Sequence, residues 1–282
     1  MSERLADIAA RIDNVRQLDA VVTAMRGIAA ARAQQSRGLL AGIEAYAATV
    51  SGAIGQALNF AAAAPPPLPE RRPRGRVSIL FAAEHGFAGA FSDRVLDAAQ
   101  LEIAGSHLMM VGTRGAAIAR ERSIAPDWTI AMASQIAGVP AIANRIADAL
   151  YMRIVNGLIS QAEMLFPRMD AGHNIVVERR ALFPLDLERF RQPQASLPPL
   201  TTLEPQILIE RLVAEYIYAR LCEAAMHAFA AENQARMEAM SAATNNIERN
   251  LGELKLQENQ MRQEEVTAEI IELAGEAAAM WR

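Results

Sequence analysis

The chain has 282 residues, a net charge of −4 at pH 7 and a hydrophobic fraction of 52%, which suits one large globular domain or two small ones and gives no argument for a nucleic-acid partner. Its single cysteine, Cys222, excludes an internal disulfide and is most simply a small buried hydrophobic residue in a reducing compartment. The first residues enter an amphipathic stretch that includes acidic residues, so we expect neither a secretory signal nor an apolar run long enough to cross a bilayer.

The first predicted element is a long helix over residues 4–60, a stretch without proline. Apolar side chains recur there at alternating steps of three and four, which places them on one helix face. These residues are Leu5, Ile8, Ile12, Val15, Leu18, Val22, Met25 and Ala29. Alanines on the same face would let a second helix approach closely, so we expect a helical partner.

Strands and helices alternate in the middle of the chain, after a proline- and arginine-rich segment (residues 65–76) that is typical of a solvated linker. The apolar runs predict strands over 77–82, 108–111 and 124–130 and helices over 91–103 and 141–158. A strand pair, 162–166 and 174–182, is expected around the turn at residues 169–172. This order predicts a small Rossmann-like α/β domain whose first strands are parallel, followed by a return linker at residues 197–199.

The last predicted element is a second long helix, from about Glu204 to Trp281, with no proline after Pro205. Its seam residues recur with the spacing of a left-handed coiled coil; they are Met237, Met240, Thr244, Ile247, Leu251, Leu254 and Met261. Such a helix would be about 110 Å long at 1.5 Å per residue, too long to pack entirely on one compact core.

The two terminal helices therefore predict an α+β fold in which a long antiparallel coiled coil is joined to the small α/β domain. An ordinary helix bundle is the alternative, and the helix length argues against it. The expected division is an N-terminal helix (1–62), a linker (63–76), a globular domain (77–200) and a C-terminal helix (201–282).

The sequence shows no motif for chemistry of its own. Residues 84–89 contain two glycines but neither the third glycine of a dinucleotide fingerprint nor the Gly-Lys-Ser/Thr of a phosphate loop, and residues 112–115 match less well. Tight strand-to-helix turns explain both sets of glycines. The four histidines have no ligand-spaced neighbours, and there is no nucleophile elbow. We expect no active site, no cofactor and no metal.

Both ends of the chain resemble the gamma subunit of rotary F-type ATP synthases. The resemblance is carried by residues 235–246 (ARMEAMSAATNN), by Asn259, Arg262-Gln263 and Thr267, by residues 272–279, and by residues 11–15 and 23–32 of the first helix. Residues 112–115 stand where the family has a Gly-Lys-Gly turn. The sequence departs from the family at Thr23 (a lysine there), at Asn245 (an aspartate there) and in the turn at residues 86–92, so partner contacts at these positions are expected to differ.

The resemblance implies a non-catalytic rotor shaft. The helical pair would be inserted in a ring of three alpha and three beta subunits, and the α/β domain would meet the epsilon subunit and the ring of c subunits. Ion translocation would be coupled to ATP synthesis or hydrolysis, and the chain would be a peripheral component at the cytoplasmic face of the inner membrane, without insertion into the bilayer.

The resemblance also implies two sets of contact residues. Those for the catalytic ring are Met25, Arg26, Arg32, Arg236, Met237, Met240, Thr244, Asn245, Asn246, Asn259, Arg262, Gln263 and Thr267. Those for epsilon or the c ring lie in turns of the globular domain: Gly86, Gly89, Gly112, Arg114 and Gly115. Two other classes stay open at this point, a cytosolic coiled-coil adaptor without ATPase partners and a small nucleotide-binding enzyme.

Overall fold

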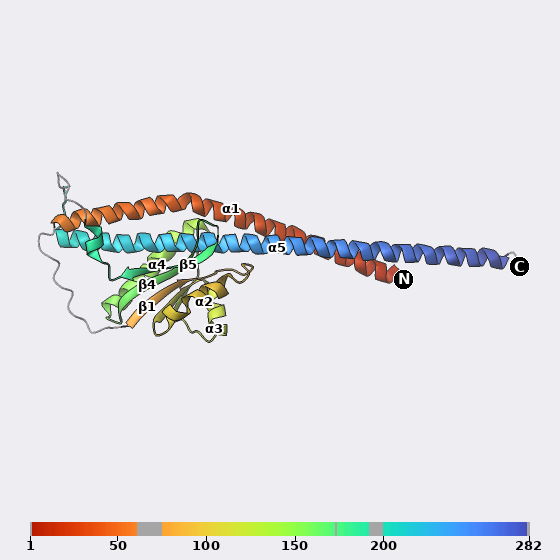
Figure 1. The fold of residues 1–282 in the computed structure, drawn as a ribbon, viewed down its shortest axis with the longest axis horizontal. Helices are drawn as coiled ribbons and strands as arrows, with labels where there is room; N and C mark the ends of the chain where they lie inside the picture. The colour runs from red at the N-terminus through yellow and green to blue at the C-terminus, as the bar shows by residue number, and fades with distance from the viewer. Residues whose placement is uncertain (1, 61–74, 173, 192–199, 281–282) are drawn as a thin grey trace. The chain divides into compact units, whose positions relative to one another are not determined.

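The computed structural model describes residues 2–60, 75–172, 174–191 and 200–280 (Figure 1). Long helices form both ends of this region, α1 (Ser2–Phe60) and α5 (Pro205–Met280), as predicted. Between them lie β1 (Gly75–Phe81), α2 (Phe91–Ile103), β2 (His107–Val111), α3 (Thr113–Glu121), β3 (Trp128–Ile130), a 3₁₀ turn (Ile136–Gly138), α4 (Val139–Val155), β4 (Ile159–Met169), β5 (Ile175–Phe183) and a second 3₁₀ turn (Leu187–Phe190). The predicted return linker and most of the proline-rich linker fall outside the described residues.

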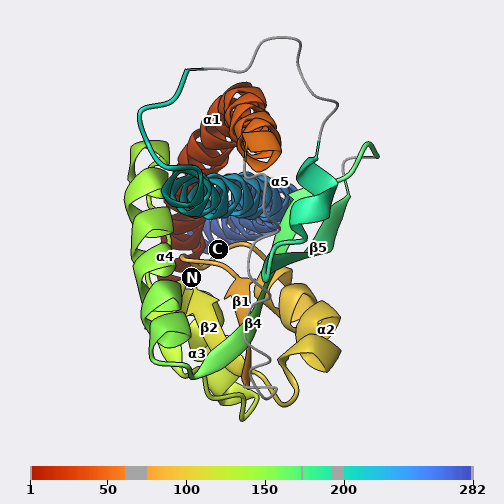
Figure 2. The same cartoon turned by 90° about the vertical axis from the view of Figure 1, so that its left-hand side faces the viewer.

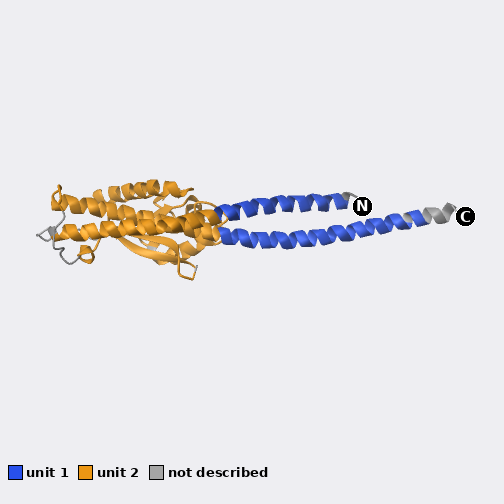
Figure 3. Cartoon of the chain, turned by 90° about the horizontal axis from the view of Figure 1, so that it is seen from above, with its two compact units in different colours: residues 1–29, 237–282 blue, residues 30–236 orange. Residues whose placement is uncertain are grey.

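The contacts divide the chain into two compact units (Figure 3). Unit 1 comprises residues 1–29 and 237–282, and unit 2 comprises residues 30–236. Each unit takes a section of α1 and a section of α5, so the boundaries fall inside helices. The division predicted from the sequence follows the helix ends instead, and it stays a prediction.

Unit 2 is built on a five-stranded sheet with the strand order β3-β2-β1-β4-β5. β1 pairs in parallel with β2 and β4, and β2 pairs in parallel with β3. β4 and β5 are antiparallel. The predicted parallel start and the predicted strand pair are both confirmed.

Both faces of the central strands β1, β2 and β4 are largely buried, which is usual for parallel strands. Along β1, Val77, Ile79 and Phe81 belong to one hydrophobic cluster and Leu80 to the other. The first cluster continues into α4 and α5, and the second continues mainly into α2 and α3. Figure 2 shows α4 and α5 on one side of the sheet and α2 on the other.

The section of α1 in unit 2 packs along α5 and runs antiparallel to it. From the C-terminal toward the N-terminal part of α1, the hydroxyl of Tyr46 donates to Glu215, and then the guanidinium of Arg37 donates to Gln234 at 2.8 Å. The partner's number thus rises as the α1 number falls. Near the start of α5, a small apolar cluster of Val50, Ile54, Leu58 and Phe190 joins the helices to the second 3₁₀ turn.

Two predicted elements are shorter in the structure. α4 ends at Val155 rather than at residue 158 because Gly157 adopts a φ of +67°, which ends the helix. β3 begins at Trp128 rather than at residue 124. The side chain of Asp127, just before it, instead accepts the N–H of Leu108 at 2.7 Å.

The predicted turn at residues 112–115 is wrong in part, because α3 already begins at Thr113. Arg114 and Gly115 therefore lie in the first turn of a helix. Gly112 makes the turn itself with a φ of +113°. Gly115 allows α3 to approach the end of β1, since a Cβ atom there would lie 2.2 Å from the Cβ of Ala82.

Unit 1 consists of paired sections of α1 and α5. Val22, Met240 and Ile247 are buried together in its main apolar cluster. The predicted seam of α5 is confirmed at four buried positions, Met240, Thr244, Ile247 and Leu254. On α1 the prediction is wrong at Leu18, which is 52% exposed. The half-buried residue between Val15 and Val22 is Asp19, so the α1 seam steps by four and then three.

α1 also passes a simple test for a membrane span. Its residues 4–59 include an 18-residue window with a mean hydropathy of 1.2. On this measure the prediction that no apolar run is long enough was wrong. The mostly buried core helix of a soluble protein passes the same test, but only 22% of this window is buried. In unit 2, the α1 residues Ala47, Val50 and Ile54 are buried against protein.

Candidate functional site

The predicted ring-contact residues occupy four different settings, of which the first is the exposed surface of α5 in unit 1. Asn259, Arg262, Gln263 and Thr267 are all exposed there. Arg262 donates to the carboxylate of Glu258 at 3.1 Å. These side chains are thus available to a partner without rearrangement of the helix.

The second setting is the seam of the helical pair. Met240 and Thr244 are buried, and the Thr244 hydroxyl donates to the carbonyl of Met240 at 3.1 Å. The other seam-side residues of the set, Met25, Arg26 and Met237, are half-buried in unit 1. Contacts within the chain therefore account for much of what these residues do.

The third group is divided between the two units. In unit 1, Asn245 and Asn246 are exposed, and Arg249 donates to Asn246 at 2.7 Å. In unit 2, Arg32 is half-buried, and its carbonyl accepts the hydroxyl of Ser36 at 2.6 Å. The asparagines therefore face outward, whereas Arg32 lies partly under its neighbours.

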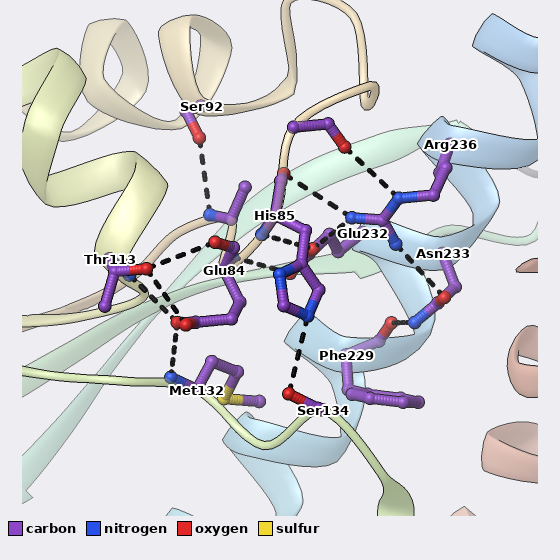
Figure 4. Close-up of polar contacts among 12 residues, drawn as sticks. Glu84, His85, Ser92, Thr113, Met132, Ser134, Phe229, Glu232, Asn233 and Arg236 are labelled. Carbon is purple, nitrogen blue, oxygen red and sulfur yellow. Dashed lines mark hydrogen bonds and ion pairs between the residues drawn. The ribbon is translucent and has the colours of Figure 1, made fainter.

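Arg236 differs from all of these because it is only 7% exposed and is held inside unit 2 (Figure 4). Its guanidinium forms an ion pair with Glu232 at 2.5 Å and donates to the side chain of Asn233 at 3.2 Å. It also donates to the main-chain carbonyls of Gly86 at 3.3 Å and His85 at 3.5 Å. The structure thus gives Arg236 partners within the chain.

Glu84 joins the ends of three strands at the same edge of the sheet (Figure 4). It follows β1, and its carboxylate accepts the N–H of Thr113, after β2, at 2.9 Å. It also accepts the N–H of Met132, after β3, at 2.7 Å, and the Thr113 hydroxyl at 2.9 Å. The N-terminus of α3 is thus satisfied by a carboxylate of the chain itself.

Sequence reasoning missed Glu84 and Glu232. Both carboxylates accept main-chain N–H groups, and no residue pattern marks such an acceptor. The one usable signal was the spacing of four between Glu232 and Arg236, which suits an ion pair on one helix face.

The loop after β1 carries the two turn glycines of the epsilon and c-ring set. Gly86 and Gly89 are exposed, and Gly89 adopts a φ of +56°. Between them Phe87 has a φ of +62° and is 68% exposed. An outward aromatic side chain in a left-handed conformation suits a contact surface, whereas Gly112 and Gly115 are buried and serve packing.

A second polar group joins α5 to β5. The buried carboxylate of Glu223 accepts Arg180 of β5 at 2.8 Å and Arg220 at 2.7 Å. Burial disfavours the charged form of Glu223, but these two hydrogen bonds outweigh it and hold the pKa of the carboxyl below its ordinary value. The ion pairs therefore stay formed at neutral pH.

His227 lies beside this group, and its ligand atom and those of Glu44 and Glu223 lie within 4.8 Å of one another. The sequence showed no ligand spacing for His227 because the fold alone assembles this cluster. Both oxygens of Glu223 already accept guanidinium groups of Arg180 and Arg220, so a metal cation would have to displace two positive charges. An ion-pair network explains the cluster better.

The comparisons with known proteins cover nearly the whole chain. A family model described as ATP synthase matches residues 4–280. The ATP synthase gamma chain of Streptomyces avermitilis is 27% identical over 96% of this chain and 94% of its own length.

Two solved structures have a similar fold. A chain of the mitochondrial ATP synthase of Euglena gracilis (OSCP/F1/c-ring) matches with a TM-score of 0.64 and 12% identity, over 99% of this chain and 95% of that one. A chain of the central stalk/c-ring structure of the Tetrahymena thermophila mitochondrial ATP synthase matches with a TM-score of 0.56 and 15% identity, over 79% and 99%. At these identities the structural likeness shows the fold alone. Because the family match extends from one long helix through the sheet to the other, the chain belongs to the ATP synthase family.

Proposed function

We propose that the chain is the central-stalk gamma subunit of an F-type ATP synthase and that it works as the rotor shaft of the complex. The observation that carries this proposal is the family match over residues 4–280, which includes both long helices as well as the sheet. A coiled-coil adaptor would need only the helices, and a nucleotide-binding enzyme would need only the sheet.

The exposed polar face of α5 in unit 1 would contact the ring of alpha and beta subunits. Asn259, Arg262 and Gln263 lie on it, and arginine is well suited to paired hydrogen bonds with carboxylates. A shaft of this kind acts by differential contact, since each orientation stabilises one conformation of a neighbouring beta subunit over the others. Ion flow through the membrane sector would thereby be coupled to ATP synthesis or hydrolysis.

The epsilon subunit and the c ring are the proposed partners of unit 2. The exposed loop with Gly86, Phe87 and Gly89 supports this assignment, because it presents an apolar side chain to solvent. The chain would then be peripheral to the membrane, at the cytoplasmic face of the inner membrane.

We further propose that the chain has no active site of its own. In open α/β sheets, phosphates bind outside the carboxyl ends of the strands, at helix N-termini. In unit 2 the N–H groups of Thr113 and Met132 at that edge are taken by the carboxylate of Glu84. A bound phosphate would have to displace this carboxylate.

Purification of the tagged chain from its own cells tests the proposal. We expect alpha and beta subunits to co-purify with it in a complex that hydrolyses ATP, and we expect the chain alone to show no hydrolysis above a mock-purified control. A chain recovered only as a free monomer would contradict the proposal. Hydrolysis by the chain alone would contradict the lack of an active site.

The contact assigned to Arg262 is tested in the assembled complex by the charge reversal Arg262→Glu. We expect ATP turnover or ATP-driven ion pumping to fall about tenfold, equivalent to about 1.4 kcal/mol. Such a loss would exceed the contribution of the exposed ion pair with Glu258, which is less than about 1 kcal/mol. The control is Lys255→Glu, which reverses another exposed positive charge on α5. Equal activity in the two variants would remove Arg262 from the contact set.

A further inference from the structure

Two oppositely charged side chains of α5 are buried in the last helical turn that belongs to unit 2, just before α5 continues into unit 1. Glu232 is 4% exposed and Arg236 is 7% exposed. They stand among alanines that are themselves buried, including Ala231 and Ala235. Burying charges is unfavourable unless hydrogen bonds compensate, so their presence calls for an explanation.

Besides their ion pair with each other and the contact of Arg236 with Asn233, these two side chains bind main-chain atoms of the loop after β1 (Figure 4). Glu232 accepts the N–H of Glu84 at 3.0 Å and the N–H of His85 at 3.2 Å. Arg236 donates to the carbonyls of His85 and Gly86. The pair therefore holds one short piece of backbone through both donors and acceptors.

This piece of backbone is itself tied to the rest of the sheet edge. The Glu84 carboxylate accepts N–H groups of Thr113 and Met132, so the loops after β1, β2 and β3 form one connected group. A rotation of α5 about its own axis would pull on all three loops through Glu232 and Arg236.

The ion pair of Glu223 with Arg180 fixes α5 at a second point, on β5. Glu223 and Glu232 are nine residues apart, which is about 13 Å along the axis and about two and a half helical turns. The two attachments thus leave α5 in roughly opposite directions. Fixation of a rod on opposite sides resists rotation about its axis.

Past Phe229, the buried apolar side chains of α5 in unit 2 are small. They are Ala230, Ala231 and Ala235, and methyl groups interlock less deeply with their neighbours than large side chains such as Met226 and Phe229 do. In this last part of α5 within unit 2, the polar contacts of Glu232 and Arg236 therefore give the main resistance to rotation.

We propose that Glu232 and Arg236 are positioning residues that lock α5 to the α/β sheet of unit 2, so that torque passes between the shaft helix and the sheet without slip. The proposal rests on the proposed rotor function. α5 continues as a helix beyond Arg236 into unit 1, so Glu232 and Arg236 lie in the last turn of α5 that unit 2 can hold.

The test uses the assembled complex in inverted membrane vesicles with Glu232→Gln and Arg236→Met variants. ATP hydrolysis and ATP-driven ion pumping are measured in the same vesicles. For Glu232→Gln we expect hydrolysis to stay within about twofold of wild type, and in both variants we expect the ions pumped per ATP to fall at least threefold, with a larger fall against an imposed ion gradient. Arg236→Lys should recover part of the loss. Glu248→Gln, an exposed position on the same helix, is the matched control.

Several outcomes separate the lock from a merely structural role. If the two side chains only stabilise the fold, hydrolysis and pumping will fall together with the amount of assembled complex, and the ratio will not change. An unchanged ratio in both variants overturns the lock. A wild-type chain that forms no coupled complex overturns the proposed function instead.

A second measurement applies even if a variant does not assemble. In the isolated chain, Glu232→Gln should increase hydrogen exchange at the amides of Glu84 and His85, which donate to that carboxylate. The amides of residues 77–81 in β1 should stay protected. Unchanged exchange at Glu84 and His85 would show that Glu232 does not hold the loop, and would overturn the proposal.

Discussion

Gly112 is the residue at which the backbone geometry leaves least freedom. Its φ is +113°, and a Cβ atom there would lie 2.4 Å from the carbonyl oxygen of Ala82. We expect Gly112→Ala to destabilise the chain by about 2 kcal/mol or more, because the strained backbone and the clash both act on the folded state. Urea unfolding of the isolated chain measures the change.

The matched control for this substitution is Gly42→Ala in α1. Nothing lies within 4 Å of a Cβ atom built at Gly42, and the residue is inside a helix. We expect this variant to be stabilised by up to about 1 kcal/mol, since alanine favours the helix over glycine. Equal effects at both positions would show that the turn is not constrained as described.

His227 gives a prediction about pH. Burial lowers its pKa, and the charge of Arg180 acts in the same direction, whereas Glu223, Glu44 and Glu178 raise it without cancelling the effect of burial. The folded state therefore binds this proton more weakly than the unfolded chain does. Its contribution to stability is present above the unfolded pKa of about 6.5 and is lost as the pH falls through the folded value.

The free energy of unfolding, measured between pH 8 and pH 5, tests this assignment. We expect it to decrease more steeply with falling pH in the wild type than in His227→Gln, which cannot take up the proton. Parallel curves for the two proteins would mean that His227 does not contribute to the acid sensitivity.

The resemblance to the family located residues on an exposed helix face, but no residue pattern predicted the acceptors that bind main-chain N–H groups. Asn259, Arg262 and Gln263 were identified by resemblance and are exposed on α5. Glu84 and Glu232 were missed because their hydrogen bonds depend on where three loops meet, and that is decided by the strand order. Arg236 was identified, but its internal partners could not be read from spacing for the same reason.

At the scale of elements, the seam of unit 1 gives a testable difference between two apolar residues of α5. Ile247 is 8% exposed in the seam, whereas Leu256 is 65% exposed. We expect Ile247→Ala to destabilise the helical pair by about 2 kcal/mol. Leu256→Ala should change stability by less than about 0.5 kcal/mol.

Hydrogen exchange resolves this prediction by region. Ile247→Ala should increase exchange over residues 12–25 and 240–254, while the sheet strands of unit 2 keep their protection, because the two units have separate cores. Increased exchange throughout the chain would contradict the division into two units.

The long helices and the parallel start of the sheet were predicted from the sequence because their signals are long or repeated. α2 was predicted to the residue, over 91–103. Shorter elements were less accurate. The nine-residue helix α3 was taken as part of a turn since its start is set by Gly112, and Leu18 was placed on the seam because steps of three and of four both fit the α1 pattern there.

At the scale of the whole molecule, removal of the residues after Gln263 separates folding from coupling. The removed part of α5 exposes Val266, Ile270 and Ile271 at 49%, 60% and 66% and contributes to none of the described apolar clusters. We therefore expect the thermal unfolding of unit 2 to be unchanged.

The same truncation should lower ATP-driven ion pumping by the complex, because the shaft loses surface that we assign to the catalytic ring. Pumping by the truncated complex at the wild-type rate would exclude that assignment. A lower melting temperature of unit 2 would instead show that these residues support the fold.

The antiparallel packing of α1 on α5 also has a consequence for biosynthesis. α1 ends at Phe60 and α5 begins only at Pro205, and a ribosome adds about 5–20 residues per second. α1 is therefore synthesised on the order of ten seconds before the helix that covers its apolar face. The strands of the sheet, by contrast, are synthesised close together in time. During that interval the emerging chain presents a long amphipathic segment, and we expect it to be a preferred client of ribosome-associated chaperones.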